Sequence, residues 1–341
     1  MPLKFAFAGF RHGHILSLYN IVQKHQDIDV VAACEEHEPT RQDLTAKGHV
    51  TVTHDNLHTL FADTEFDVLA VGEYFAQRGP TAIKALERGK HVIVDKPLCT
   101  RLDEVDQLEQ LSAQSGLKIG CMLTMRDAGQ SLGMRQLVQQ GMIGEIHAIT
   151  FGGQHPLLLD SRPGWYFEPG KHGGTINDIA IHAIDALPWI TGQGFARIEA
   201  ARCWNAFAPE VPHFEDGGQM MLTLDNGAGV LGDVSYFMPD KAGYSLPQYW
   251  RLTLWGRLGL IETATTAKEI VLTLATDKEP QILPAPAANS GGYLESFLAD
   301  IAGTSQPDQL DTAAVLKSAR TVLKIQEAAD TGAKDVLLES V

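Results

Sequence analysis

The chain is poor in cysteine, with four among 341 residues, at positions 34, 99, 121 and 203. None of them forms a C-x-x-C pair, so the sequence offers neither a disulfide framework nor a cysteine-based zinc motif, and we expect no metal. They are interpreted as small buried apolar residues. The short apolar stretch at the N-terminus ends in a turn and does not resemble a secretory signal. We therefore expect reduced thiols and a cytoplasmic protein.

Basic residues are also scarce, since 27 Lys and Arg face 42 Asp and Glu, which gives a net charge of −15. Such an acidic chain repels nucleic-acid backbones and anionic lipid, so neither is expected as a main partner. No apolar run approaches the ~18 residues of a membrane span. At roughly 150 residues per domain, the length predicts two domains. A small-molecule ligand remains the expected partner.

Short apolar runs alternate with helical periodicity in the first third of the chain. This alternation is typical of βαβ units, and right-handed crossovers then give a doubly wound parallel sheet. We predict such a Rossmann domain over residues 1–125. The strand-like runs are 3–8, 28–34, 68–71, 91–94 and 117–122, and the helical segments are 14–24, 81–88 and 102–112.

The pattern changes after about residue 125. One helix is predicted over 173–190, and the hairpin signal Asp225-Asn226-Gly227 joins two of the strands that follow it. Consecutive strands with short turns predict an α+β domain with an open, mostly antiparallel sheet over 126–341. The long helix 311–330 is expected to pack back on the first domain. The predicted strands are 198–205, 218–224, 229–237, 249–255, 258–263 and 269–274.

A glycine-containing turn follows the first predicted strand and opens the first predicted helix. At this place in parallel α/β folds, backbone N–H groups and a helix N-terminus hold the pyrophosphate of a dinucleotide. The spacing departs from G-x-G-x-x-G, because Arg11 and His14 stand where the second and third glycines are expected. A purely structural turn is the alternative. The residues of the candidate cofactor turn are Gly9, Phe10, Arg11, His12, Gly13 and His14.

The end of the second predicted strand carries an acidic residue that fits the same kind of site. Glu35 lies 21 residues after His14, where a carboxylate accepts hydrogen bonds from an adenosine ribose. A carboxylate there repels a 2′-phosphate, and no arginine follows at once, so NAD is predicted over NADP. The alternative is a solvated charge at the end of a strand.

A D-K-P element follows the predicted strand 91–94 directly. Ligands of open α/β sheets bind at the carboxyl ends of the strands, where Asp95 and Lys96 stand. A lysine at this place polarises a carbonyl or hydroxyl as a fixed cation. Pro97 fixes the turn, with a cis bond as one option. Taken alone, the tripeptide is better explained by a surface lysine.

An acid and an imidazole share one face of the helix predicted over 173–190. Asp178 and His182 are four residues apart on an otherwise apolar stretch, where burial is costly unless the groups are paired or functional. Histidine has the pKa of a general base near neutrality. A satisfied core pair is the alternative, and a metal site lacks a third ligand with suitable spacing.

Taken together, these motifs resemble the Gfo/Idh/MocA family of oxidoreductases. The resemblance rests on the N-terminal glycine turn, ALERGKHVIVDKPL at 85–98, MIGEI at 142–146 and GGTINDIAIHAIDALPWITG at 173–192. It implies a Rossmann domain, an open-sheet second domain, a nicotinamide cofactor and sugar- or polyol-like substrates. It also implies that Lys96, Asp178 and His182 are the catalytic residues.

The sequence departs from the family where members often read C-T-P-N-x-x-H. Residues 72–78 read GEYFAQR instead, so Arg78 replaces the histidine, and Asp95 replaces the family's glutamate before lysine. We expect Tyr74, Arg78 and Asp95 to face the cofactor. Arg126, His155 and Trp165 are expected to line the substrate pocket, and the basic stretch 162–172 either binds an anionic group or lies in solvent.

Three functions agree with the sequence. The first is an NAD-dependent oxidoreductase in which Lys96 and His182 assist hydride transfer to or from a secondary alcohol of a sugar, polyol or derivative. The second is a hydrolase or lyase with tightly held NAD that oxidises its substrate transiently. The third is a non-catalytic nucleotide-binding subunit. The resemblance further implies a homodimer or homotetramer joined through an apolar sheet face.

Overall fold

The chain divides into two units in the computed structural model, which describes residues 2–338. The first unit combines residues 1–122 with the segments 163–173 and 293–319, and the second combines 123–162, 174–292 and 320–341. The sequence places a single boundary near residue 125. The chain passes from the first unit to the second between Met122 and Leu123, close to that point. It later returns to the first unit twice.

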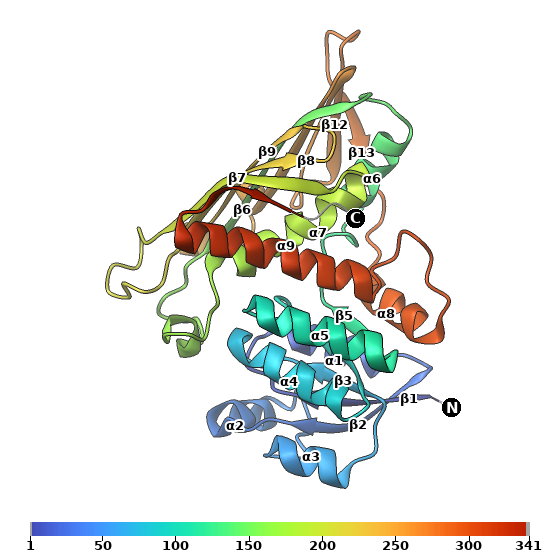
Figure 1. Ribbon diagram of the computed structural model, residues 1–341, viewed down its shortest axis with the longest axis vertical. Coiled ribbons are helices and arrows are strands. Elements are labelled where there is room, and N and C mark those ends of the chain that lie inside the picture. Colours follow the sequence, from blue (N-terminus) through green and yellow to red (C-terminus); the bar gives the residue numbers. More distant parts are fainter. Residues whose placement is uncertain (1, 339–341) are drawn as a thin grey trace. The chain divides into compact units, whose positions relative to one another are not determined.

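The first unit contains a five-stranded parallel sheet in the order β2-β1-β3-β4-β5, which confirms the predicted doubly wound fold (Figure 1). Its strands are mostly buried, most completely β3 and β5, as expected for a parallel sheet covered on both faces. The strands are β1 (Leu3–Ala8), β2 (Ile28–Cys34), β3 (Val68–Val71), β4 (His91–Val94) and β5 (Ile119–Cys121). The helices between them are α1 (His14–Val22), α2 (Glu38–Lys47), α3 (Leu57–Asp63), α4 (Phe75–Glu87) and α5 (Leu102–Ser115).

The last strand of this sheet is anchored by segments from late in the chain. α8 (Gly292–Ala302) and the start of α9 (Thr312–Thr331) belong mainly to the first unit. The backbone N–H of Ile119 donates to Thr312 Oγ1 at 2.9 Å, and Lys118 forms an ion pair with Asp300 at 3.0 Å. The long helix predicted over 311–330 therefore exists, with its residues from Arg320 onward assigned to the second unit.

The second unit is built on a nine-stranded sheet in the order β13-β12-β11-β10-β6-β9-β8-β7-β14. β6 and β9 pair in parallel, whereas the other neighbouring strands described pair antiparallel, as the mostly antiparallel prediction requires. The first strands are β6 (Ile146–Pro156), β7 (Phe195–Trp204), β8 (Gly217–Leu224) and β9 (Gly229–Met238). They are followed by β10 (Trp250–Gly256), β11 (Gly259–Ala264), β12 (Glu269–Leu274), β13 (Gln281–Pro284) and β14 (Lys334–Leu337).

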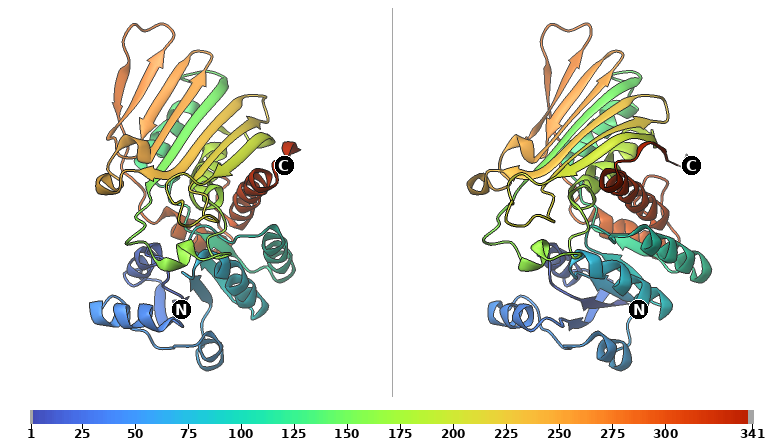
Figure 2. Two further views of the ribbon diagram at one scale, coloured as in Figure 1. Left: turned by 90° about the vertical axis from the view of Figure 1, so that its left-hand side faces the viewer. Right: turned by 60° about the vertical axis from the view of Figure 1, so that its left-hand side comes forward.

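Helices cover one face of this sheet. α6 (Gly129–Gln139) contacts β11 and β12, and α7 (Ile181–Thr191) packs on α6. Within the described residues of this unit no α-helix lies on the opposite face (Figure 2). That face carries exposed apolar side chains, among them the directly paired Met221 and Leu231 as well as Trp255 and Ile282. The sheet therefore presents an uncovered apolar surface.

The segment predicted as one helix over 173–190 is built differently. Gly173 and Gly174 have positive φ angles of 79° and 97°, which a right-handed helix cannot contain. The segment continues as a short π-helix, Ile176–Ala180, and then as α7. The prediction of a single helix starting at residue 173 was therefore wrong. The hairpin at Gly227 was correct, since its N–H closes the β8–β9 turn on the Leu224 carbonyl.

Three further short helices lie in connecting segments. They are the 3-10 helices η1 (Gly164–Phe167), η3 (Asp240–Ala242) and η4 (Pro247–Tyr249), while the π-helix Ile176–Ala180 carries the label η2. Among residues 2–338, none of the helices combines the length and the hydropathy that crossing a bilayer requires.

Candidate active site

The glycine turn of the first unit closes over the carboxyl ends of β1, β2 and β3. The Gly9 N–H donates to the Cys34 carbonyl and the Arg11 N–H to the Gly72 carbonyl, both at 2.9 Å. Gly9 has a φ of 79°, and a Cβ at this position would lie 2.6 Å from the Glu73 carboxyl carbon. No side chain caps α1, and the space around Gly13 is open. An anion could therefore approach the N-terminus of α1.

Glu35 holds this turn in place. Its Oε2 accepts the Phe10 N–H at 2.6 Å, and its Oε1 accepts the His37 N–H at 2.8 Å. Burial raises the pKa of Glu35, while the two backbone N–H groups act in the opposite direction. The predicted hydrogen bond to a ribose remains a prediction. The structure shows that the same carboxylate also fixes the turn.

A second carboxylate, Glu73, lies against the turn and was not recognised in the sequence. Its side chain occupies the space that the missing side chain of Gly9 leaves open. Burial and then the charge of Glu35 raise the pKa of Glu73 to about 7. Glu73 follows β3, and no sequence motif marks it. Its contact with Gly9 could be found only once β1 and β3 were known to be neighbouring strands.

Asp95, directly after β4, is the centre of a buried charge cluster. Its Oδ2 lies 2.6 Å from His12 Nδ1 and accepts a hydrogen bond from Arg78 Nη2 at 2.8 Å. Burial alone would raise the pKa of Asp95, but Arg78 and His12 outweigh it and hold that pKa well below its usual range. Burial lowers the pKa of His12 to about 3, so its imidazole is neutral.

Arg78 braces the loops at this edge of the sheet. It is fully buried on α4, and its guanidinium donates to the carbonyls of Glu73 (2.8 Å), Asp95 (3.0 Å) and Lys96. The Lys96–Pro97 bond is cis, as the sequence allowed. Lys96 is buried, and its Nζ lies 5.9 Å from the ring centre of Phe75. Arg78 thus binds the backbone on both sides of the Asp95–Lys96 bond, and the predicted contact with the cofactor remains a prediction.

An aromatic cluster packs against the glycine turn within the first unit. Trp165 and Tyr166 stack at 4.2 Å, and Phe75 meets Trp165 edge-on at 4.9 Å. Trp165 Nε1 donates to the Arg11 carbonyl at 3.0 Å. The sequence assigned Trp165 to a substrate pocket in the second domain, whereas the structure assigns it to the first unit. Tyr74, at the edge of the cluster, lies 6.2 Å from Trp165.

The second unit carries Asp178 on the π-helix and His182 on α7, both buried. The start of the π-helix is held by Gln326 of α9, whose Oε1 accepts the N–H groups of Ile176 (3.0 Å) and Asn177 (3.2 Å). Gly174 makes this possible, because a Cβ there would lie 2.2 Å from the Gln326 amide. Short π-helices occur frequently at functional sites.

Aromatic residues from the sheet surround these two side chains. The Tyr236 hydroxyl donates to Asp178, and Trp250 lies edge-on to His182 at 5.9 Å. His155 of β6 lies 6.3 Å from Trp250 and 5.1 Å from Tyr249. Burial raises the pKa of Tyr249 to about 12, with a further rise from Tyr244 and Asp178. The predicted residues Asp178, His182 and His155 thus share one cluster.

Arg126, also predicted to contact substrate, forms a two-point ion pair in the second unit. Its Nε and Nη2 donate to the two carboxylate oxygens of Asp185 at 2.8 and 2.7 Å. Asp185 is buried on α7, one turn after His182. In the structure Arg126 therefore braces the helix that carries His182, and a substrate contact remains a prediction.

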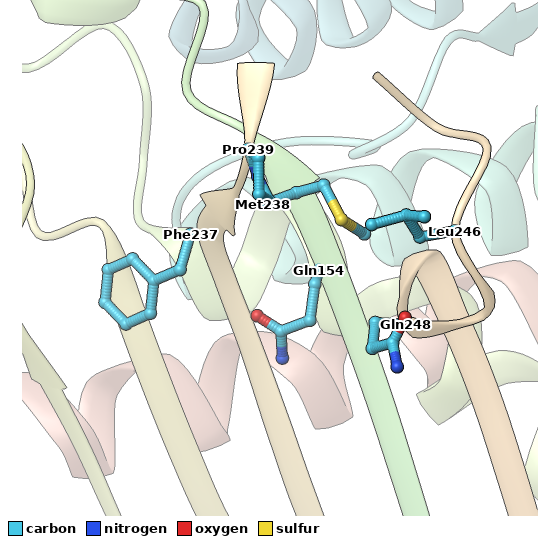
Figure 3. A pocket seen from close by; sticks show the side chains of 6 residues that line it. All are labelled: Gln154, Phe237, Met238, Pro239, Leu246 and Gln248. Carbon is cyan, nitrogen blue, oxygen red and sulfur yellow. The ribbon is translucent and has the colours of Figure 1, made fainter. Parts of the chain in front are cut away.

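A separate pocket of about 440 Å³ opens on the second unit (Figure 3). Two of its residues, Gln154 and Phe237, are the strand neighbours of His155 and Tyr236. Side chains alternate between the faces of a sheet, so this pocket lies on the face opposite to the Asp178 cluster. Its lining consists of Gln154, Phe237, Met238, Pro239, Leu246 and Gln248.

Comparison with known protein families agrees with this architecture. Residues 3–122 match the family described as "Oxidoreductase family, NAD-binding Rossmann fold", and residues 132–262 match the "GFO/IDH/MocA C-terminal domain". The chain belongs to the Gfo/Idh/MocA family. The first unit is therefore the family's NAD-binding Rossmann fold, and the open sheet of the second unit is its C-terminal domain.

Relatives in this family include sugar-acting enzymes. The chain is 28% identical to 1,5-anhydro-D-fructose reductase of Ensifer adhaerens over 138 residues, 40% of each chain. It is 28% identical to D-glucoside 3-dehydrogenase of Escherichia coli over 170 residues, 49% of this chain and 47% of that protein. These matches span less than half the length of the curated relatives.

A likeness to solved structures extends over the whole chain. An inositol dehydrogenase homolog from Azotobacter vinelandii, solved with NAD+, superposes with a TM-score of 0.80 at 17% identity, covering 100% of this chain and 98% of that one. At this identity the comparison shows that the two chains share a fold.

Several residues of this site lie beyond the family motifs. Tyr236, Trp250 and Gln326 contact the Asp178–His182 segment but come from β9, β10 and α9. Only the alternation along β9 could have hinted at an inward-facing Tyr236. The parallel pairing of β6 with β9, which brings His155 and Tyr236 within 6.2 Å, joins strands far apart in sequence.

Proposed function

We propose that the protein is an NAD-dependent oxidoreductase that acts on a secondary alcohol, or the matching carbonyl, of a sugar, polyol or derivative. The observation that carries the proposal is the buried cluster of Asp178, His182 and Tyr236 in a chain whose other unit is an NAD-binding Rossmann fold. The named sugar-acting relatives support the substrate class.

The residues of the glycine turn fit a dinucleotide. The uncapped N-terminus of α1 and the open space at Gly13 suit a pyrophosphate, because backbone N–H groups at a helix start attract anions. Glu35 at the end of β2 favours NAD over NADP, since a second negative charge would be repelled there. When bound, the nicotinamide ring supplies the group that accepts or returns a hydride.

Residues of this chain then transfer the substrate's proton and stabilise the charge that develops on the substrate. His182 takes the hydroxyl proton of the substrate during oxidation and returns it during reduction. Lys96 stabilises the negative charge that develops on the substrate oxygen. Asp178, held by the Tyr236 hydroxyl, orients His182 or binds a neighbouring substrate hydroxyl. A neutral, hydroxyl-rich substrate suits this mixture of carboxylate, imidazole and phenol.

We also propose that two or more copies associate through the uncovered sheet face of the second unit. Met221, Leu231, Trp255 and Ile282 would otherwise expose a broad apolar surface to water. A cytoplasmic location is part of the same proposal, since the four cysteines form no disulfide. Burial raises the pKa of the Cys34 thiol to about 12, which makes it unreactive.

A dehydrogenase screen with site variants tests the function. Purified protein with NAD or NADP is offered sugars, inositols, sugar acids and aldehydes, and NADH is followed by absorbance. Lys96→Ala and His182→Ala should each lower kcat by about 10²–10⁴ while NAD still binds. Lys24→Ala and His147→Ala, at exposed positions, are the matched controls.

The outcomes separate the alternatives. Near-normal turnover in Lys96→Ala or His182→Ala would remove that residue from the mechanism. Substrate turnover without net NADH would favour a hydrolase or lyase that oxidises its substrate only transiently. NAD binding without turnover of any compound in the screen would favour a nucleotide-binding subunit.

A further inference from the structure

Three potential metal ligands converge beside the glycine turn of the first unit. His12, His14 and Asp95 each offer one ligand atom, and these atoms all lie within 4.8 Å of one another. The two imidazoles come from one H-x-H segment, and the carboxylate follows β4. Two imidazole nitrogens with one carboxylate oxygen form a ligand set that zinc sites use, with a fourth position left open.

The spacing suits a tetrahedral ion. His14 Nδ1 lies 3.5 Å from Asp95 Oδ1. A tetrahedral zinc ion with bonds of ~2.0–2.2 Å would separate two ligand atoms by roughly 3.4 Å. The observed distance is long for a hydrogen bond. Although Asp95 is fully buried, its Oδ1 has no hydrogen bond of ordinary geometry among the described residues and meets only His14 Nδ1 at 3.5 Å, so this oxygen can coordinate a cation.

The surroundings supply an outer shell and a route of entry. Arg78 Nη2 holds Asp95 Oδ2 at 2.8 Å, which fixes the carboxylate and leaves Oδ1 as the ligand. His14 is half-exposed, with 53% of its side chain accessible, so an ion can enter from solvent. His12 Nδ1, 2.6 Å from Oδ2, would transfer its contact from the carboxylate to the ion.

The same surroundings limit the affinity. The guanidinium of Arg78 and the N-terminal end of α1, which begins at His14, both carry positive charge. Both repel a dication, so binding should be weaker than at a structural zinc site. The selectivity follows from the nitrogen ligands, which favour zinc and other late transition metals over magnesium and calcium.

We propose that His12, His14 and Asp95 form a binding site for a divalent transition-metal ion, with zinc preferred over magnesium. This site departs from the expectation, drawn from the sequence, that the chain holds no metal. The sequence shows the H-x-H pair, but the third ligand lies 81 residues after His14 and is brought near by the order of strands β1, β3 and β4. The site needs neither NAD nor substrate.

Calorimetric titration of the full-length, chelator-treated protein tests the proposal. Zinc chloride is titrated into wild type, into His14→Gln and into His58→Gln, an exposed control histidine on α3 of the same unit. Wild type should bind about one zinc per chain, and His14→Gln should bind that zinc at least about 10- to 100-fold more weakly. His58→Gln should match wild type. Magnesium chloride should not compete.

A cobalt titration gives a second readout that does not depend on counting bound ions. A four-coordinate cobalt ion at this site should produce intense visible absorption bands in wild type and in His58→Gln, and these bands should be lost in His14→Gln. Circular dichroism verifies that each variant is folded. Equal zinc affinity and equal spectra in wild type and His14→Gln would overturn the proposal and assign the bound ions to surface histidines.

Discussion

Replacing Gln326 tests how the Asp178–His182 segment is held. Gln326 is 6% exposed, and its Oε1 accepts two backbone N–H groups, from Ile176 at 3.0 Å and Asn177 at 3.2 Å. In Gln326→Leu, a side chain of similar size with no polar atom, both buried donors lose the Gln326 oxygen as their acceptor. Each unsatisfied buried donor costs about 1–3 kcal/mol. We therefore expect a loss of about 2–4 kcal/mol in the free energy of unfolding.

Two measurements check this value. Denaturant unfolding gives the change in stability, and hydrogen–deuterium exchange of the peptide covering residues 173–182 reports the local effect. Exchange of this peptide should accelerate in Gln326→Leu. The value of kcat should fall as well, because the π-helix in this peptide carries Asp178. Glu327→Gln, the exposed neighbour on α9, should change stability by less than ~0.5 kcal/mol. Equal stability and exchange in both variants would refute the reasoning.

A charged replacement gives a sharper form of the same test. Gln326→Glu keeps the oxygen that accepts the two N–H groups but loses the amide that donates to Asp330 at 2.7 Å. Burial already raises the pKa of Asp330, so a second carboxylate beside it is unfavourable when ionised. The pKa of the new carboxyl should be raised in the folded state. This variant should therefore be destabilised at neutral pH and recover as the pH falls, whereas Gln326→Leu, which loses the same donor to Asp330 but adds no second carboxylate, should recover less.

Three further predictions concern other parts of the molecule. The pKa of Glu73 is about 7 when folded, above its ordinary 4.5, so the native state binds more protons and the free energy of unfolding falls as the pH rises between these values. Glu73→Gln should reduce that fall by about 1–3 kcal/mol in denaturant titrations at pH 5 and 8, and parallel pH curves would contradict this. Glu35→Ser should raise the ratio of NADP to NAD affinity in fluorescence titrations. An unchanged ratio would show that Glu35 does not set the preference for NAD over NADP. Leu231→Glu, opposite Met221 on the uncovered sheet face, should lower the mass measured by light scattering without altering circular dichroism. An unaltered mass would mean that association, if any, uses another surface.

The fold was predictable where apolar runs are short and fully buried. β1, β2, β3 and β4 lie at the predicted residues, because parallel strands covered on both faces contain little besides apolar side chains. α2 was missed since it is largely polar, with only Leu44 buried. β6 was missed because its run GGQHP contains two glycines and a proline. These elements were not predicted because their sequences are only weakly amphipathic, not because their structure is unusual.

The candidate site was predictable to the extent that its residues sit in local motifs. Asp178 and His182 were recognisable from their spacing, and Lys96 from its place after a strand. The partners that fix them could not be recognised, since Tyr236 and Gln326 reach the same helix from 58 and about 150 residues away. A sequence pattern reports neighbours along the chain, whereas burial of a charged group depends on neighbours in space.

Asp95 and Arg78 stabilise each other in the buried interior of the first unit. The Asp95 carboxylate and the Arg78 guanidinium meet at 2.8 Å, and the guanidinium also donates to the Lys96 carbonyl. A buried charge is costly unless it is paired, so removing either side chain should destabilise the fold. Their joint effect is to hold Lys96 at the end of β4, which is the position that the proposed chemistry requires.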